Sequence, residues 1–358
     1  MSTDINKKYA VYLFGPPNNL RLNFDTNWQP FDSKDKHFID FSESVFFEKW
    51  EPKNRFENTE DHIWKDWLGS LFWDEMIKED GVVSLVCLGD IDSKDHELTN
   101  RIHIAFNSFR IAYPFRPPAH YRSKILIGEY RGDKHDYTIL SINSVQNQIS
   151  YIDPFYAQNS TKEQSQWYYG NFHREEVLKE VAKFFERTDY CIKEFKKYCI
   201  ENECESRLNH DRSQVEKSIY AFNKALKNRH VSYVIPCFIR GLDCLLALKP
   251  GEGQIVFADR IIDFLCDETF ENPFYQEFSL KSDLIDLYRL RNDCVHGRNW
   301  DYNFQEKYKR MMTKEELARF SFIAEDILRR FIKKFLFSDE LIQNTFSRAL
   351  IEEFWATK

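Results

Sequence analysis

The sequence lacks the signatures of the commonest metal, nucleotide and membrane proteins. None of its eight cysteines belongs to a Cys-x-x-Cys pair, its histidines form no metal-ligand grouping, and it has no Walker-type phosphate loop. No stretch approaches the roughly 20 apolar residues of a membrane span, and the first residues lack the apolar run of a signal peptide. We therefore expect a cytoplasmic protein that needs no metal or other cofactor, contacts no membrane, and keeps its thiols reduced and mostly buried.

The second half of the chain has no net charge. Residues 205–358 contain 24 Lys and Arg against 24 Asp and Glu, so the net charge of −7 falls entirely in residues 1–204. A neutral domain has no broad electrostatic footprint for a nucleic-acid polymer, although a local basic patch can still bind RNA. Any contact with nucleic acid is therefore expected to be local.

Short apolar or alternating runs separated by turn signals predict a mixed α/β domain over residues 1–165. Short loops join the last three expected strands, which favours an antiparallel arrangement. Trp and Leu recur at helical spacing around residues 64–72, which predicts a helix with an apolar face against a core or, alternatively, a stacking platform for bases. The domain is a possible sensor or recruiting module for a regulatory partner or ligand. The expected strands are 9–14, 82–88, 102–113, 124–130, 137–142 and 149–152.

From residue 166 onwards the apolar residues recur every three to four positions, which is typical of helices. We expect a helical connector over residues 166–204 and an all-α bundle over residues 205–358. The whole chain is thus predicted to be α+β, with antiparallel strands in its mixed amino-terminal domain. The helices expected in the bundle are 215–226, 231–248, 255–266, 280–295, 315–336 and 340–354.

The expected helix 280–295 ends in a segment that combines arginine and histidine. Leucines and Cys294 form its apolar stripe, and Arg291 falls on the same stripe. Gly297 is a typical αL cap, so the helix is expected to end at His296. A chain that leaves the helix there can turn the imidazole back towards the guanidinium. The plain alternative is a helix end at which His and Arg interact favourably with the helix dipole.

An arginine and a histidine at one helix end suit RNA cleavage by the 2′-hydroxyl group. Histidine titrates near neutrality and can accept the 2′-hydroxyl proton or donate a proton to the leaving 5′-oxygen. Arginine stays charged and can hold the phosphate, so no metal is needed. We therefore predict Arg291 and His296 as catalytic residues, with Asn292 orienting the imidazole or binding a phosphate oxygen. Arg289, two turns before the histidine, is a candidate phosphate contact.

The segment 287–297, Leu-Tyr-Arg-Leu-Arg-Asn-Asp-Cys-Val-His-Gly, resembles the signature of HEPN domains, specifically of the Apea-like branch. The segments 238–246, 258–265 and 324–332 resemble three further helices of that group, in the same order and spacing. The resemblance covers residues 206–337. It implies a dimeric helical bundle, HEPN-like in fold, in which two Arg-x4-His segments form one composite ribonuclease site. It also implies a toxin or antiviral defence effector that cuts tRNA, mRNA or rRNA.

Two departures from the HEPN pattern restrict what the resemblance implies. Arg298 stands where some relatives carry a tyrosine, and Asp243 stands where a glutamate is commoner. Residues 298–310 interleave basic and aromatic residues in an expected loop, which suits a path for single-stranded RNA or, equally, a connection anchored by its aromatics. The basic residues expected to bind RNA are Arg289, Arg298, Lys307, Lys309 and Arg310.

Three functional hypotheses are compatible with these residues. The first is a metal-independent endoribonuclease of cell defence or growth arrest. The second is a non-catalytic, dimeric module that binds RNA or protein, and the third is the passive half of a toxin–antitoxin pair. Cleavage of RNA in EDTA separates the first from the second, and harm on overexpression separates the first from the third.

Overall fold

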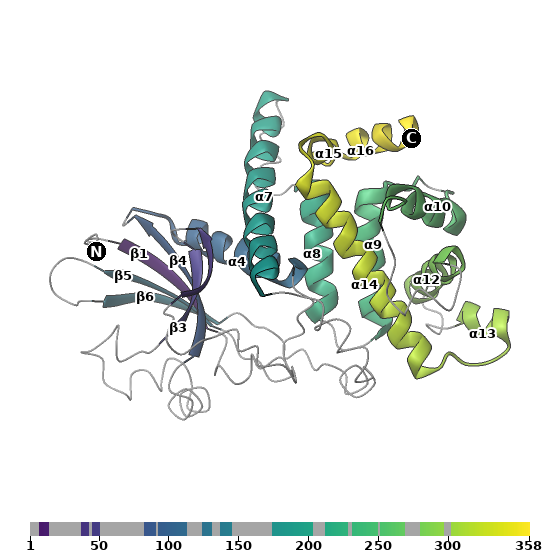
Figure 1. Cartoon of the computed structure of the whole chain (residues 1–358), viewed down its shortest axis with the longest axis horizontal. Coiled ribbons are helices and arrows are strands. Elements are labelled where there is room, and N and C mark those ends of the chain that lie inside the picture. Colours follow the sequence, from purple (N-terminus) through teal and green to yellow (C-terminus); the bar gives the residue numbers. More distant parts are fainter. Residues whose placement is uncertain are drawn as a thin grey trace. The chain divides into compact units, whose positions relative to one another are not determined.

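The structure, a computed structural model, describes helices and strands from both halves of the chain (Figure 1). The described residues are 7–13, 37–42, 45–50, 82–90, 92–112, 124–130, 137–144, 174–202, 212–227, 231–249, 251–268, 280–296 and 302–358. The chain divides into two compact units, one made of residues 1–150 and 171–186 and the other of residues 151–170 and 187–358. Helix α7 (Arg174–Glu201), which falls in the expected connector, contributes residues to both units.

Among the described residues of the first unit, six strands form an antiparallel sheet (Figure 1). They are β1 (Lys7–Leu13), β2 (His37–Ser42), β3 (Val45–Trp50), β4 (Val82–Asp90), β5 (Lys124–Tyr130) and β6 (Tyr137–Ser144), in the spatial order β2-β3-β4-β1-β5-β6. β1 pairs with both β4 and β5, and its Ala10 lies opposite Cys87 with both side chains fully buried. Helix α4 (Asp95–Ala112) packs on β1, β3 and β4, and an ion pair of 2.5 Å joins Asp95 to Lys8.

The described part of the chain is mostly helical, with ten helices and six strands, which corrects the α+β class expected from the sequence. The expected strand 102–113 is instead the second half of α4. Its apolar residues alternate at 102, 104 and 106, which imitates a strand, but Leu98, Ile102 and Phe106 are buried at helical spacing. The sequence also failed to predict β2 and β3. The expected helix around 64–72 and the expected strand 149–152 lie outside the described residues.

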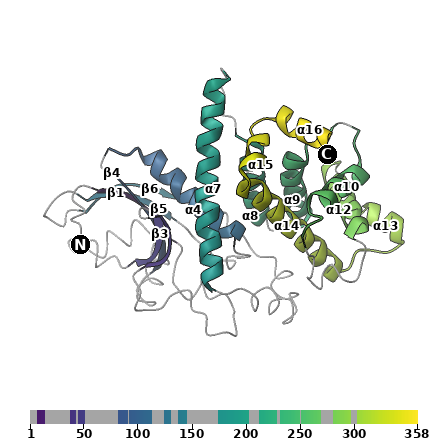
Figure 2. The same cartoon turned by 45° about the horizontal axis from the view of Figure 1, so that its top comes forward.

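The second unit is a helical bundle, shown from two directions in Figures 1 and 2. Its helices are α8 (Gln214–Lys227), α9 (Val231–Leu246), α10 (Gln254–Phe264), α12 (Leu280–Val295), α13 (Tyr302–Tyr308), α14 (Lys314–Phe337), α15 (Asp339–Asn344) and α16 (Arg348–Thr357). α9 is central because it packs against α8, α10, α12, α14 and α16. Phe238, Ile239, Leu242 and Leu245 of α9 are all fully buried, as expected for a helix with neighbours on most sides.

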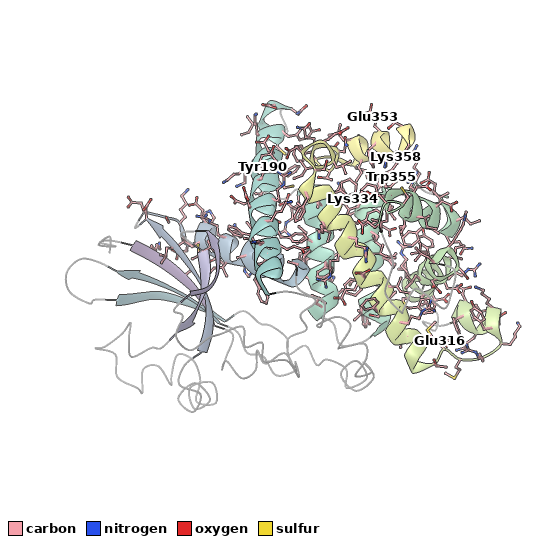
Figure 3. The ribbon with its side chains drawn as sticks, viewed as in Figure 1. Tyr190, Glu316, Lys334, Glu353, Trp355 and Lys358 are labelled. Carbon is pink, nitrogen blue, oxygen red and sulfur yellow. The ribbon has the colours of Figure 1, made fainter. Side chains whose placement is uncertain are left out.

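Helix α16 closes the carboxyl end of α9. The Trp355 indole N–H donates a hydrogen bond of 2.8 Å to the Leu245 carbonyl, and Arg348 donates one of 2.5 Å to the Leu248 carbonyl. Figure 3 shows Trp355 on the side of α16 that faces the bundle. These contacts fix the last turn of α9, which follows directly on Asp243.

Two expectations for the bundle are wrong. The expected single helix 340–354 is divided into α15 and α16, because Ser347 caps a new helix by accepting a hydrogen bond of 3.1 Å from the N–H three residues later. The expected loop 298–310 contains helix α13, whose buried Phe304 packs against Tyr308 at 4.5 Å between ring centroids. These two rings are four residues apart, which is a helical spacing. The helix was not predicted because polar and charged residues make up most of the segment around them.

Candidate functional site

Helix α12 ends where the sequence predicted, and it leaves His296 exposed. The helix spans Leu280–Val295, and the His296 N–H still donates a hydrogen bond of 3.0 Å to the Asn292 carbonyl. The apolar stripe is confirmed in its middle, since Leu284 and Leu287 are fully buried, whereas Leu280 and Cys294 are half-buried. Within the described residues, the His296 imidazole has no hydrogen-bond or ion-pair partner. The imidazole is thus exposed at the surface of the bundle.

Arg291 is held between α12 and α9. One terminal nitrogen of its guanidinium donates to Asp243 Oδ2 at 3.1 Å, and the other donates to Asn292 Oδ1 at 2.9 Å. The guanidinium also lies 5.6 Å from the centroid of the Tyr288 ring, which packs on Phe257 of α10. The structure therefore brings Arg291, Asn292 and Asp243 together. None of the described contacts joins the guanidinium to the imidazole of His296.

Asp243 is a partly buried carboxylate that depends on its arginine partner. Burial raises the pKa of this carboxyl, while the charges of Arg291 and Arg348 and the hydrogen bond from Arg291 lower it. Its Oδ1 atom is buried and accepts no hydrogen bond from any residue that the structure describes. Burial and the charge of Asp243 also raise the pKa of Tyr288. This cluster orients the guanidinium of Arg291 towards α9, and each terminal nitrogen donates one described hydrogen bond.

Substituting Asp243 is expected to change how stability depends on pH. The folded-state pKa is raised above 3.8, so the folded chain binds a proton more tightly than the unfolded chain does. The contribution of Asp243 to stability is therefore fully present below pH 3.8 and is lost as the pH rises through the folded-state value. We expect the free energy of unfolding of wild type to fall relative to that of Asp243→Asn between pH 3.5 and 7. Urea unfolding at several pH values measures this, and a difference that stays constant with pH contradicts it.

Three of the basic residues expected to bind RNA form ion pairs within the bundle. Lys307 donates to both oxygens of Asp286, at 2.8 and 3.0 Å, and Arg289 donates to the same carboxylate at 3.2 Å. Arg310 forms a two-pronged pair with Glu316, at 2.6 and 2.8 Å. In Figure 3 Glu316 lies at the amino end of α14, near α13. Glu316 balances the charge of Arg310, which weakens the attraction of Arg310 for a phosphate, whereas Lys307 and Arg289 share one carboxylate and keep one positive charge between them.

The remaining two expected RNA contacts are less constrained. Lys309 is exposed and lies 3.9 Å from Glu306, a distance at which a surface ion pair contributes little. Arg298 lies outside the described residues. Of the expected RNA contacts that the structure describes, Lys309 is thus the one most open to solvent, with 78% of its side chain exposed.

Sequence reasoning missed the acidic residues that organise this face of α12. Asp286 and Asp293 are buried, and Asp293 is fully so. Asp293 accepts hydrogen bonds from Asn303 of α13, at 2.7 Å from the backbone N–H and 2.5 Å from the side-chain amide. A signal was present, since Asp286 and Asp293 stand seven residues apart next to Leu287 and Cys294 of the apolar stripe. An acid on a buried helix face requires a partner.

Other chemistries find little support in the described residues. No group of three or more His, Cys, Asp or Glu side chains there is arranged to hold a metal ion. Seven cysteines are described, all as free thiols, and burial together with the charge of Asp293 raises the pKa of Cys294 to about 11. That thiol stays protonated near neutral pH and is a poor nucleophile. None of the described helices is both long and apolar enough to cross a membrane.

Comparisons with protein-family models, curated proteins and solved structures find no match for this chain. They therefore lend no support to the HEPN resemblance, which depends on the four segments of the sequence. The function has to be inferred from the end of α12 and its neighbours. Those neighbours are Asp243 on α9 and Asn303 on α13.

Proposed function

We propose that this chain is a metal-independent endoribonuclease that cleaves RNA by attack of its own 2′-hydroxyl group. The observation that carries the proposal is the end of α12. There an exposed histidine without a partner among the described residues stands five positions after an arginine held by Asp243 and Asn292. One proton-transfer group and one cation for the phosphate are thus available at one helix end.

Each residue has a role in the proposed reaction. His296 accepts the proton of the 2′-hydroxyl or donates one to the leaving 5′-oxygen, because imidazole exchanges protons near neutral pH. The two hydrogen bonds of Arg291 occupy two of the five N–H groups of a guanidinium, so the others can reach the non-bridging oxygens. The Asn292 amide accepts a hydrogen bond from Arg291 at its oxygen, and its N–H groups, which have no partner among the described residues, can donate to a phosphate oxygen.

The proposed partners are RNA and a second copy of the chain. One α12 end supplies a single histidine, whereas general acid and base catalysis uses two proton-transfer groups, so a two-fold contact between α12 ends completes the site. Val295, next to His296, is 59% exposed, and an apolar side chain there suits such a contact. Light scattering at micromolar concentration measures the oligomeric state, and a monomer would contradict the composite site.

We propose a role as a toxin or antiviral defence effector that acts on tRNA, mRNA or rRNA in the cytoplasm. The support is the HEPN resemblance of the sequence. A ribonuclease whose site reads no particular RNA sequence also harms its own cell unless its activity is controlled. The amino-terminal unit, which is the other compact unit of the chain, is the proposed place of control by a partner or ligand.

A second candidate function is a non-catalytic dimeric module that binds RNA or protein. The observation that favours it is the pairing of charges around α12, where Arg291, Arg289 and Lys307 each contact a carboxylate of the bundle. Two of these pairs, Arg291–Asp243 and Lys307–Asp286, join different helices, a structural role that needs no catalysis. RNA binding that persists without cleavage at any concentration would support this candidate over the ribonuclease.

The ribonuclease is tested by incubating the whole chain with total cellular RNA in EDTA. Attack by the 2′-hydroxyl leaves a 2′,3′-cyclic phosphate on one product and a 5′-hydroxyl on the other, so ligation-based sequencing of RNA ends reports both the chemistry and the cut sites. We expect these ends to accumulate at the same rate with and without EDTA. Cleavage that stops in EDTA, or products with 5′-phosphates, would contradict the proposal.

A further inference from the structure

Helix α13 is anchored to α12 beside the candidate site by a fully buried carboxylate. Asp293 lies between Arg291 and His296 in the sequence and accepts two hydrogen bonds from Asn303, the second residue of α13. One comes from the Asn303 backbone N–H at 2.7 Å and the other from its side-chain amide at 2.5 Å. The first N–H groups of a helix have no partner within it, so the carboxylate acts as a cap supplied by another helix.

A second carboxylate holds the other end of α13. Asp286, seven residues before Asp293 and therefore on nearly the same face of α12, accepts hydrogen bonds from Lys307 and from the Tyr308 hydroxyl at 2.8 Å. The later residue of α12, Asp293, bonds to the start of α13 at Asn303, and the earlier one, Asp286, bonds to its end at Lys307. The two helices therefore lie antiparallel. Figures 1 and 2 both show α13 beside α12.

No described side-chain contact holds the imidazole of His296, so its position is set by the backbone that carries it. The imidazole has no partner among the described residues, and Gly297, which follows, imposes little restriction on the chain. Asn303, seven residues after His296 in the sequence, bonds to Asp293 of α12. Asp293 lies about one helical turn before His296. The anchor at Asp293 thus holds Asn303 to α12 within one helical turn of His296.

We propose that Asp293 is a positioning residue that, by anchoring Asn303, places the imidazole of His296 for its reaction. The inference rests on the proposed ribonuclease function, and it adds α13 to the catalytic apparatus as a support. The anchor contacts no reacting atom. Its effect is on the turnover step, because a small displacement of a proton-transfer group slows the reaction while substrate binding continues.

The test uses a reciprocal exchange in the full chain. Asp293→Ala removes both acceptor oxygens, and Asn303→Asp sets two carboxylates against each other, so each single change breaks the anchor. The exchange Asp293→Asn with Asn303→Asp restores complementarity, since the new amide oxygen accepts the backbone N–H of residue 303 and the new amide N–H groups reach the new carboxylate. We expect kcat in EDTA to fall by about 100-fold in each single variant with little change in KM. The exchange should recover most of the loss.

Asp283→Asn is the matched control. Asp283 is a similarly buried carboxylate of α12, but it pairs with Arg319 of α14, and its described interaction with α13 is only the charge of Lys307. We expect this variant to lower the melting temperature and to leave kcat unchanged. Single variants at 293 and 303 with wild-type kcat, or an exchange that recovers the melting temperature without kcat, would overturn the inference.

A spectroscopic arm separates this inference from the ribonuclease proposal. In protein labelled with ¹³C at histidine Cε1, the His296 ring signal, assigned with His296→Ala, should be sharp in wild type and in the exchange variant. It should shift and broaden in each single variant. If wild type cleaves no RNA, the ribonuclease proposal fails, and the ring signals still decide on the anchor. An identical signal in all four proteins would overturn the anchor, whether or not the chain cleaves RNA.

Discussion

Replacing His296 by alanine is expected to lower the rate of RNA cleavage in EDTA by about 10²- to 10⁴-fold, the usual contribution of a general acid or base. The loss should appear in kcat, because an exposed imidazole that transfers protons contributes little to binding the substrate. Stability should not change, since the imidazole has no partner among the described residues. Single-turnover cleavage of a defined RNA and the melting temperature measure the two effects.

A companion substitution tests the arginine separately. Arg291→Lys keeps the positive charge beside Asp243 but loses the fork that can bond to Asp243, Asn292 and a phosphate together, so we expect about a 10²-fold loss of kcat. Lys281→Ala is the control, because Lys281 lies at the amino end of α12, pairs with Asp259 at the surface, and takes no part in the proposed chemistry. Equal cleavage by His296→Ala and wild type would remove the basis of the catalytic assignment.

The sequence predicted the helices of the bundle because their apolar faces repeat over several turns. The expected helix 280–295 has the observed bounds of α12, and the expected helix 315–336 differs from α14 by one residue at each end. Leucines at helical spacing and a glycine after His296 define the first of these, and both signals are local. Local signals also suffice to place His296 at a helix end, which is the feature that suggested its chemistry.

The contacts that hold the site could not be predicted, because they join residues far apart in the sequence. Asp243 and Arg291 are 48 positions apart, and nothing in either helix alone indicates that they meet. Asp293 pairs with Asn303 of a helix that the sequence did not reveal. The misassignment of 102–113 has the opposite cause, since its apolar residues fit the periods of both a strand and a helix, and only packing against the sheet decides between them.

Replacing Arg319 by methionine is expected to lower the free energy of unfolding by about 3–5 kcal/mol, the largest stability effect we predict for a single substitution. Asp283 and Arg319 form an ion pair between α12 and α14, in which the carboxylate is 6% and the guanidinium 12% exposed. Removal of the arginine leaves a buried carboxylate without its main partner. Replacing both residues, as Asp283→Leu with Arg319→Met, should restore a stability close to that of wild type, because an apolar pair needs no solvation.

The dependence of this loss on pH distinguishes an unpaired charge from poor packing. Burial raises the pKa of Asp283 and Arg319 lowers it, so the pKa rises further when the arginine is removed. A raised carboxyl pKa means stability that is present at low pH and lost as the pH increases. The nearby Asp286 and Lys307 act on Asp283 in opposite senses and are present in both proteins. Urea unfolding should therefore show a large deficit of Arg319→Met at pH 7 that shrinks towards pH 4, whereas a deficit independent of pH would assign the effect to lost packing.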